Sequence, residues 1–282
     1  PDMLVKPPKD SWPAYHGDYS GRRHSSLTQI TEQNVHNLGL AWAFQTGVNQ
    51  ALKCSPLLVD GVLYITMPDD VWAVDARSGH QLWHYAYGKN NGFHIGNRGV
   101  SMYRDWLFFM TPDAHLICLN RLTGGLMWDN NMPQTKGHFG SSSAPMVVGD
   151  LVITGVSGGD SPLLGFLVAY KATTGEEAWR FHTIPRPGER GSETWKGTAI
   201  GIGGGATWLT GSYDADTGTL YWTVGNPFPA TDAAERGGEN FYTNCVIALD
   251  VKTGKLKWYY QVTPHDLHDW DATEPMLLVD AD

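Results

Sequence analysis

The chain has 282 residues, with 20 Lys and Arg against 29 Asp and Glu, which gives a formal net charge of −9. Recognition of a phosphate backbone needs a basic face, so this charge argues against a nucleic-acid partner. Hydrophobic residues make up 41% and charged residues 17%, a balance that fills a core and excludes a disordered chain. No apolar run reaches the roughly 18 residues of a membrane-spanning helix. The length fits one large domain or two of ordinary size.

The N-terminal residues and the cysteines leave the cellular compartment open. Residues 1–15 lack the basic-then-apolar layout of a signal peptide, and a mature start after cleavage would look the same. Cys54, Cys118 and Cys245 are too far apart for metal-type spacing. Their apolar neighbours predict buried thiols rather than a disulfide.

High glycine and aromatic content predicts an all-β protein, with 33 Gly, 12 Trp and 12 Tyr. The longest helical candidate, residues 31–42, predicts a turn or one short helix that leads into a strand. Residues 55–67 then form two apolar stretches around a Val-Asp-Gly hairpin signal, and similar apolar stretches recur at 106–111 and 145–156.

Each of these stretches is followed by a copy of one repeat, and four copies align without gaps: Ala73–Trp83, Cys118–Trp128, Ala169–Trp179 and Ala248–Trp258. Each copy has a strand, a Ser/Thr-Gly turn, and a Trp four residues after the Gly. Gly adopts the positive φ of a tight turn at no steric cost, and the Ser/Thr hydroxyl can bond the turn backbone. A Trp at a constant offset points in a constant direction, so we expect it to pack against the neighbouring unit.

The spacing of the repeats favours a β-propeller. The four Trp residues are separated by 45, 51 and 79 residues, and blades are typically about 40–50 residues long. The last interval leaves room for an extra segment, residues 211–226, with strands of its own. A β-helix would need shorter, parallel rungs, whereas these turns are tight hairpins. We therefore predict a β-propeller of four-stranded antiparallel blades over residues 1–282, with 276–282 as the first half of a further hairpin, so that the chain stops within a blade.

Beyond the Trp repeats, three motifs resemble the pyrroloquinoline quinone (PQQ) dependent alcohol dehydrogenases, which include methanol and ethanol dehydrogenases. They are SWPAYHGDYSGRRHSSLTQIT at 11–31, LGLAWAFQTG at 38–47 and TPHDLHDWDATEP at 263–275. The resemblance covers essentially the whole chain. It implies an eight-bladed propeller of which this chain is the N-terminal half or slightly less, and a periplasmic location.

The resemblance also implies a cofactor site. In the family, PQQ lies between a Trp indole, here Trp208, and a vicinal disulfide. The remaining matching positions are Arg98, Ser142, Ser157, Gly158, Gly159 and Lys53. The sequence departs from the family where Gly92 and Phe93 replace the two cysteines and where Lys53 replaces a Glu. Phe93 or His94 is then expected to offer a different face to the cofactor.

The metal ligands of the family match Asp160, Asn226 and Asp269, which are hard oxygen donors suited to Ca²⁺. Asp160 replaces a longer Glu. Asp271 matches an extra carboxylate of lanthanide-using members, so Ca²⁺ and a lanthanide both stay open. We expect Asp269 and Asp271, two apart on a strand, to share one face.

The reaction implied by the resemblance is alcohol oxidation. Asp269 acts as general base, a hydride moves to metal-polarised PQQ, and electrons pass to a cytochrome c-type acceptor. We expect the isolated chain to be incomplete, with a homodimer or the missing half of the propeller as its partner. Two other classes stay open: a non-catalytic propeller scaffold built from the same repeats, and a polymer- or glycan-binding protein that uses the aromatic surface.

Overall fold

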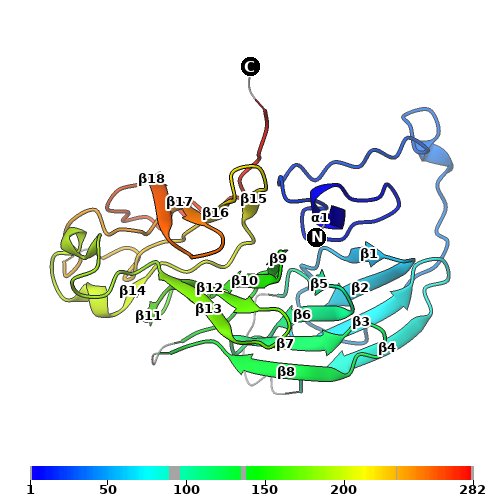
Figure 1. The fold of residues 1–282 in the computed structure, drawn as a ribbon, viewed down its shortest axis with the longest axis horizontal. Helices are drawn as coiled ribbons and strands as arrows, with labels where there is room; N and C mark the ends of the chain where they lie inside the picture. Colours follow the sequence, from blue (N-terminus) through cyan, green and yellow to red (C-terminus); the bar gives the residue numbers. More distant parts are fainter. Residues whose placement is uncertain (1, 89–95, 135–137, 233, 281–282) are drawn as a thin grey trace.

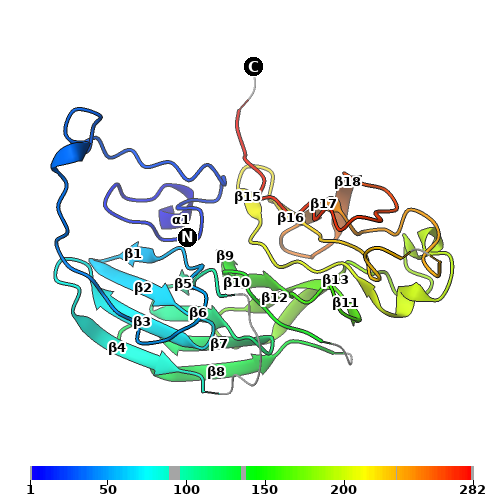
Figure 2. The same ribbon diagram turned by 180° about the vertical axis from the view of Figure 1, so that it is seen from behind.

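The structure is a computed structural model and describes residues 2–88, 96–134, 138–232 and 234–280. Four antiparallel sheets of four strands follow one another around an arc, and β1, β5, β9 and β15 lie on its concave side (Figures 1 and 2). The first sheet contains β1 (Leu57–Val59), β2 (Val62–Thr66), β3 (Asp70–Asp75) and β4 (Gln81–Ala86). The second contains β5 (Ser101–Tyr103), β6 (Trp106–Met110), β7 (His115–Asn120) and β8 (Leu126–Asn131). The third contains β9 (Met146–Val148), β10 (Leu151–Gly155), β12 (Phe166–Lys171) and β13 (Glu177–His182), and the fourth β15 (Ser212–Asp214), β16 (Thr219–Thr223), β17 (Cys245–Asp250) and β18 (Leu256–Gln261).

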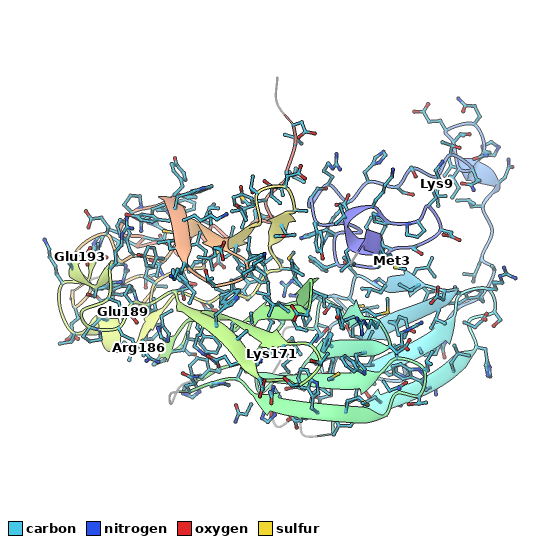
Figure 3. The ribbon with its side chains drawn as sticks, viewed as in Figure 1. Met3, Lys9, Lys171, Arg186, Glu189 and Glu193 are labelled. Carbon is cyan, nitrogen blue, oxygen red and sulfur yellow. The ribbon has the colours of Figure 1, made fainter. Side chains whose placement is uncertain are left out.

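The remaining elements are short. They are α1 (Asp2–Val5), the 3₁₀ helices η1 (Val35–Asn37), η2 (Ser192–Thr194) and η3 (Ala199–Gly201), and the parallel pair β11 (Leu163–Leu164) and β14 (Gly203–Gly204). Figure 3 shows Arg186, Glu189 and Glu193 on the long connection between β13 and β14, at one end of the arc. No helix in the described ranges is long and apolar enough to cross a membrane. The predicted all-β propeller architecture is confirmed, and the four sheets of the described residues form an arc that does not close into a ring.

The Trp repeat joins each sheet to the next. The ring of Trp179 lies flat on the turn of the following sheet, where a Cβ at Gly254 would be 2.5 Å from it. The indole N–H of Trp179 donates to the Val251 carbonyl oxygen at 2.9 Å. Trp42 on Gly79, Trp83 on Gly124 and Trp128 on Gly175 repeat the ring contact. The predicted packing of Trp against the neighbouring unit is therefore confirmed, and it requires a residue without a side chain in the turn.

A small residue lies opposite each Trp within its own sheet. Ala73, Cys118, Ala169 and Ala248 pair with the repeat Trp, and the strand register shifts immediately after each of them. Cys118 thus occupies an alanine position, and burial raises the pKa of its thiol to about 12. All three cysteines are free; Cys118 and Cys245 are buried and Cys54 is partly buried. The prediction of thiols rather than a disulfide is confirmed.

The core lies between neighbouring sheets. Its largest cluster joins the inner strands of the second, third and fourth sheets, with Phe108, Val152, Leu167, Trp222 and Ile247 each fully enclosed. Burial of such side chains contributes roughly 1.5–3 kcal/mol each, which makes inter-sheet packing the main source of stability. The strands that carry these residues are buried on both faces and read as continuous apolar runs, as the sequence indicates.

Three local expectations differ from the structure. Residues 276–280 form no strand; Leu278 instead donates its N–H to the Ser20 carbonyl oxygen, because no second strand lies beside it in the described chain. Segment 211–226 is not an insertion, because it supplies β15 and β16, the first two strands of the fourth sheet. The long interval before the last Trp comes from the connections 183–211 and 224–244. Asp269 and Asp271 lie in a loop rather than on a strand.

Candidate active site

Four of the predicted cofactor residues occupy equivalent places in the four sheets. Lys53, Arg98, Ser142 and Trp208 each precede the first strand of a sheet by three or four residues. Backbone and side-chain hydrogen bonds connect these loops in series: Ser55 N–H to the Arg98 carbonyl at 3.0 Å, Arg98 N–H to the Ser142 carbonyl at 3.1 Å, and Thr210 Oγ1 to the Ala144 carbonyl at 2.7 Å. The propeller repeat therefore brings residues distant in sequence together before the first strands of the four sheets.

Arg98 lies at the centre of this group. Its Nη1 donates to the Ser142 Oγ at 2.8 Å and to the Ser142 carbonyl oxygen at 3.1 Å. Its guanidinium carbon is 4.8 Å from the ring centroid of Trp208, a cation–π contact. Burial lowers the pKa of Arg98, and nearby Tyr15 partly offsets this. The group still carries its charge at neutral pH, since arginine is effectively always protonated.

Lys53 borders this group. Its aliphatic stem lies against Gly96, where a Cβ would be 2.9 Å from the Lys53 Cγ. The neighbouring residue Leu52 forms an isolated parallel β-bridge with Asn97, which holds Lys53 next to the loop that carries Arg98. Gly92, Phe93 and His94, which were expected to replace the family disulfide, lie outside the described residues.

Two predicted metal ligands, Asp160 and Asn226, follow the second strands of the third and fourth sheets, and three predicted cofactor residues precede Asp160. Ser157, Gly158, Gly159 and Asp160 come directly after β10, and Asn226 comes three residues after β16. A Cβ at Gly159 would be 3.1 Å from the Asn226 Oδ1, so the two loops touch beside Asp160. Gly158 has a φ of +111° and leaves no room for a side chain beside the His138 carbonyl. Ser157 exchanges backbone hydrogen bonds with Gly140 at 2.8 and 3.0 Å. Gly158 is thus required by a close backbone approach, whereas Gly159 makes room for the Asn226 side chain.

Asp160, Asp269 and Asp271 are close enough to perturb one another. Burial, followed by the charges of Asp269 and Asp160, raises the pKa of Asp271 to about 6. Burial also raises the pKa of Asp269, followed by Asp160 and Asp266. Asp271 also lies by Trp208, because a Cβ at Gly225 would be 3.1 Å from the Asp271 Oδ1 and 3.4 Å from the Trp208 Nε1. Asp271 thus lies directly beside the predicted stacking indole, with Asp269 and Asp160 near it.

Such a cluster without a cation is electrostatically unfavourable, because like charges near one another oppose ionisation. The Asp271 Oδ1 is buried with no hydrogen-bond partner of standard geometry. An oxygen in that position fits a cation, and all four candidate ligands supply hard oxygen donors. In the described ranges, no three His, Cys, Asp or Glu side chains are placed so that they could hold a metal ion by themselves. It is the chemistry of the donors, with Asn226 as the neutral ligand and the unpartnered Asp271 Oδ1, that fits an oxygen-ligated Ca²⁺ or lanthanide.

Asp269 and Asp271 lie near each other as expected, but the predicted cause, two residues on one face of a β-strand, was wrong. Both residues have left-handed backbones, with φ of 60° and 48°. Asp and Asn tolerate this conformation better than other side chains. The two carboxylates are therefore directed by a tightly folded loop and not by the alternation of a strand.

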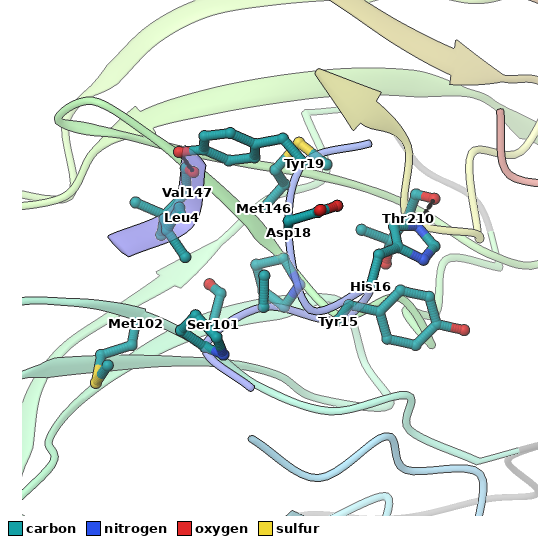
Figure 4. A pocket seen from close by; sticks show the side chains of 13 residues that line it. Leu4, Tyr15, His16, Asp18, Tyr19, Ser101, Met102, Met146, Val147 and Thr210 are labelled. Atoms are coloured by element: carbon teal, nitrogen blue, oxygen red, sulfur yellow. Dashed lines mark hydrogen bonds between the residues drawn. The ribbon is translucent and has the colours of Figure 1, made fainter. Parts of the chain in front are cut away.

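The N-terminal segment contributes residues for which the sequence suggested no role. Tyr15 and His16 lie on the concave side, and Figure 4 shows His16 beside Thr210, whose carbonyl oxygen is 3.3 Å from the His16 Nε2. The Arg23 Nε donates to the His16 Nδ1 at 3.1 Å, and its guanidinium carbon lies 4.4 Å from the Tyr15 ring centroid. The cavity around these residues has only about 10 Å³ of free space, so it is a packing site and not a ligand site. Their only sequence signal was the motif at 11–31.

The fold and this site define a β-propeller that gathers oxygen ligands, an arginine and an indole on its concave side. The chain belongs to the family described as the PQQ glucose/ethanol/alcohol dehydrogenase β-propeller domain, which matches residues 12–282.

Individual relatives support the same placement. The chain is 35% identical to the quinohemoprotein alcohol dehydrogenase of Comamonas testosteroni, over 95% of this chain and 41% of that protein. It is 32% identical to the lanthanide-dependent methanol dehydrogenase of Methylacidiphilum fumariolicum, over 99% of this chain and 51% of that protein. The chain thus spans about half the length of these curated relatives.

Solved structures agree. The crystal structure of the Comamonas testosteroni quinohemoprotein alcohol dehydrogenase superimposes with a TM-score of 0.93 at 32% identity, covering 99% of this chain and 45% of that one. A europium-containing methanol dehydrogenase gives a TM-score of 0.89 at 30% identity, covering 100% of this chain and 54% of that one.

Proposed function

We propose that the whole protein is a PQQ-dependent dehydrogenase that oxidises an alcohol, with residues 1–282 contributing to one propeller domain. The observation that carries this proposal is the convergence of Asp160, Asp269 and Asp271 beside Asn226 and the Trp208 indole. A repeat scaffold has no need to place three carboxylates together, because their mutual repulsion destabilises the fold unless a cation binds.

Each element of the site has a defined task. PQQ, when bound, supplies the redox chemistry as the acceptor of a hydride. Trp208 offers a flat stacking surface, and Arg98 offers a charged fork held by Ser142 for a carboxylate of the cofactor. Lys53 adds a second cation at the edge, and the backbones of Ser157, Gly158 and Gly159 permit close approach.

Asp160, Asn226, Asp269 and Asp271 would hold the metal. Three carboxylates balance a trivalent ion better than a divalent one, so this ligand set favours a lanthanide over Ca²⁺. The relatives named for a lanthanide and for europium are consistent with that choice. Asp269 is also the candidate general base, because it matches the family position and a carboxylate held beside the alcohol can accept its proton.

The partners follow from the same family. We propose a small alcohol as substrate, a cytochrome c-type protein as electron acceptor, a periplasmic location, and association with the rest of the propeller or with a second copy. The alternative, a non-catalytic scaffold, leaves the pairing of Arg98 with Trp208 and the carboxylate cluster without a purpose.

The test is reconstitution of the whole protein with PQQ and either Ca²⁺ or La³⁺, followed by an alcohol-dependent dye-reduction assay. We expect activity in the wild type, highest with La³⁺, and none in Asp269→Ala, with an unchanged circular dichroism spectrum. Full activity of Asp269→Ala would remove this residue as the base. Absence of PQQ binding under both metals would favour the scaffold.

A further inference from the structure

A buried side-chain pair attaches the loop that carries Asp269 and Asp271 to the rest of the protein. Asn244 and Asp266 are 0% and 2% exposed. The Asn244 Nδ2 donates to the Asp266 Oδ2 at 2.7 Å, which joins the end of the 226–244 connection to the loop 266–272. Neither residue belongs to the predicted ligand set, and neither was indicated by the sequence.

Both the nitrogen and the oxygen of the Asn244 side-chain amide form hydrogen bonds with this loop. Its Oδ1 accepts the Ala272 N–H at 3.2 Å, one residue after Asp271. Its own backbone N–H donates to the Gly225 carbonyl oxygen at 3.0 Å, one residue before Asn226. The amide orientation is unambiguous, because one end faces an obligate donor and the other a carboxylate. Asn244 thus connects the strand end bearing one predicted ligand to the loop bearing two others.

Asp266 organises the loop from its other end. Its Oδ1 accepts the His268 N–H at 2.8 Å, and its Oδ2 accepts the Trp270 N–H at 3.0 Å. These two donors flank Asp269. Arg236, which is fully buried, donates through Nη2 to the Asp266 carbonyl oxygen at 2.6 Å and places a positive charge near this carboxylate. Buried charge is tolerated when it is compensated and hydrogen-bonded in this way.

The backbone of the loop needs such support. Asn244, His265, Asp269 and Asp271 all have φ between 48° and 60°. Non-glycine residues in that region persist only where the surrounding structure determines their conformation. The hydrogen bonds of Asn244 and Asp266 to three loop N–H groups supply that determination.

We propose that Asn244 and Asp266 form a positioning clamp that holds Asp269 and Asp271 against Asn226 and so preorganises the cation site. Neither residue touches the cation itself. The inference rests on the proposed function, since it assumes that these carboxylates bind a metal. Partners that orient metal ligands typically contribute about 10–100-fold to metal affinity.

Terbium titration of the protein, with Tb³⁺ alone as probe and luminescence excited through tryptophan, tests the clamp without any assay of turnover. Asn244→Asp keeps the volume, the left-handed backbone and the acceptor for Ala272, but it faces Asp266 with a second carboxylate. Asn244→Gly keeps the backbone and removes both side-chain bonds. We expect both variants to weaken Tb³⁺ binding about 10–100-fold and to shorten the luminescence lifetime, because water replaces displaced carboxylates.

The added negative charge of Asn244→Asp separates a loss of positioning from a simple change in electrostatic attraction for Tb³⁺. If the loop needed no positioning, the added negative charge of Asn244→Asp would tighten Tb³⁺ binding instead of weakening it. Asn130→Asp is the matched control. Asn130 also donates a hydrogen bond through its Nδ2, in this case to the Gly175 carbonyl oxygen, but it lies on β8 at the outer edge of the second sheet. We expect this control to bind Tb³⁺ as the wild type does. Should Asn244→Asp not fold, Asp266→Asn serves, since it loses the acceptor for both Trp270 and Asn244.

Two outcomes overturn the inference in distinguishable ways. Wild-type affinity and lifetime in the Asn244 variants, or tighter Tb³⁺ binding by Asn244→Asp, would show that the loop holds its ligands without the clamp, while leaving the metal site intact. Failure of the wild type to bind Tb³⁺ at all would overturn the proposed metal site and the clamp with it.

Discussion

The docking of each Trp on the next sheet predicts a large difference between two residues at equivalent repeat positions. Trp179 is 7% exposed, lies on Gly254 and donates to the Val251 carbonyl oxygen. Trp258 is 48% exposed, and no turn of a following sheet covers it in the described chain. Trp179→Ala removes a buried ring and leaves a cavity, which costs about 3–5 kcal/mol. Trp258→Ala in the 282-residue chain should cost less than about 1 kcal/mol, since surface substitutions are usually small.

Urea denaturation followed by far-ultraviolet circular dichroism measures both values, because this signal is less affected than fluorescence by the loss of one tryptophan. Gly254→Ala approaches the same contact from the other side: a Cβ there would lie 2.5 Å from the Trp179 ring, on a backbone with φ of +68°. We expect it to lower the free energy of unfolding by an amount similar to Trp179→Ala. Equal losses for Trp179→Ala and Trp258→Ala would refute docking as the inter-sheet contact. In a longer form of the protein with a fifth repeat, Trp258→Ala should become as costly as Trp179→Ala.

Four further outcomes follow from the site. Burial, and then Arg23, lower the pKa of His16 to about 4, against 6.5 for an unperturbed His. The unfolded state therefore binds a proton that the folded state excludes, so the contribution of His16 to the free energy of unfolding is complete above pH 6.5 and falls by up to about 3 kcal/mol toward pH 4. His16→Gln should flatten this dependence of stability on pH. Asp269→Asn should abolish alcohol-dependent dye reduction while leaving the thermal midpoint within a few degrees of the wild type; residual turnover above a few per cent would contradict its role. Arg98→Lys should weaken PQQ binding about tenfold in equilibrium dialysis, because a point charge cannot both bond Ser142 and stack on the indole; unchanged binding would mean that the guanidinium does not contact the cofactor. Asp271→Ala should weaken La³⁺ binding more than Ca²⁺ binding in calorimetric titrations, and an equal loss for both ions would argue against charge matching.

The sequence predicted most of the fold because the propeller repeat is local. A strand, a turn glycine and a Trp at fixed spacing are visible without tertiary information, and the glycine position matches the observed ring contact. The Ala/Cys position opposite the Trp is also part of the repeat. Residues 276–280 show the limit of this reasoning: an apolar run with a hairpin signal forms no strand where no partner strand lies beside it.

The site was less accessible to sequence reasoning. Family motifs indicated Arg98, Ser142 and Trp208, and the structure brings these three together. The conformation of the 266–272 loop was not predictable, because it depends on hydrogen bonds to the distant Asn244, which the tolerance of Asp for a left-handed backbone does not reveal. Asn244 lies before β17 and 22 residues from Asp266, so only the folded chain shows their contact. Tyr15 was equally hidden, since its proximity to Arg98 joins the N-terminal segment to the second sheet.

Anomalous diffraction from crystals of the whole protein grown with PQQ and La³⁺ tests the central claim most directly. The account predicts one strong lanthanum peak on the concave side, about 2.3–2.6 Å from oxygens of Asp160, Asn226, Asp269 and Asp271, with a flat ring stacked on Trp208 beside it. A peak bound elsewhere, or an indole face covered only by solvent, would contradict it.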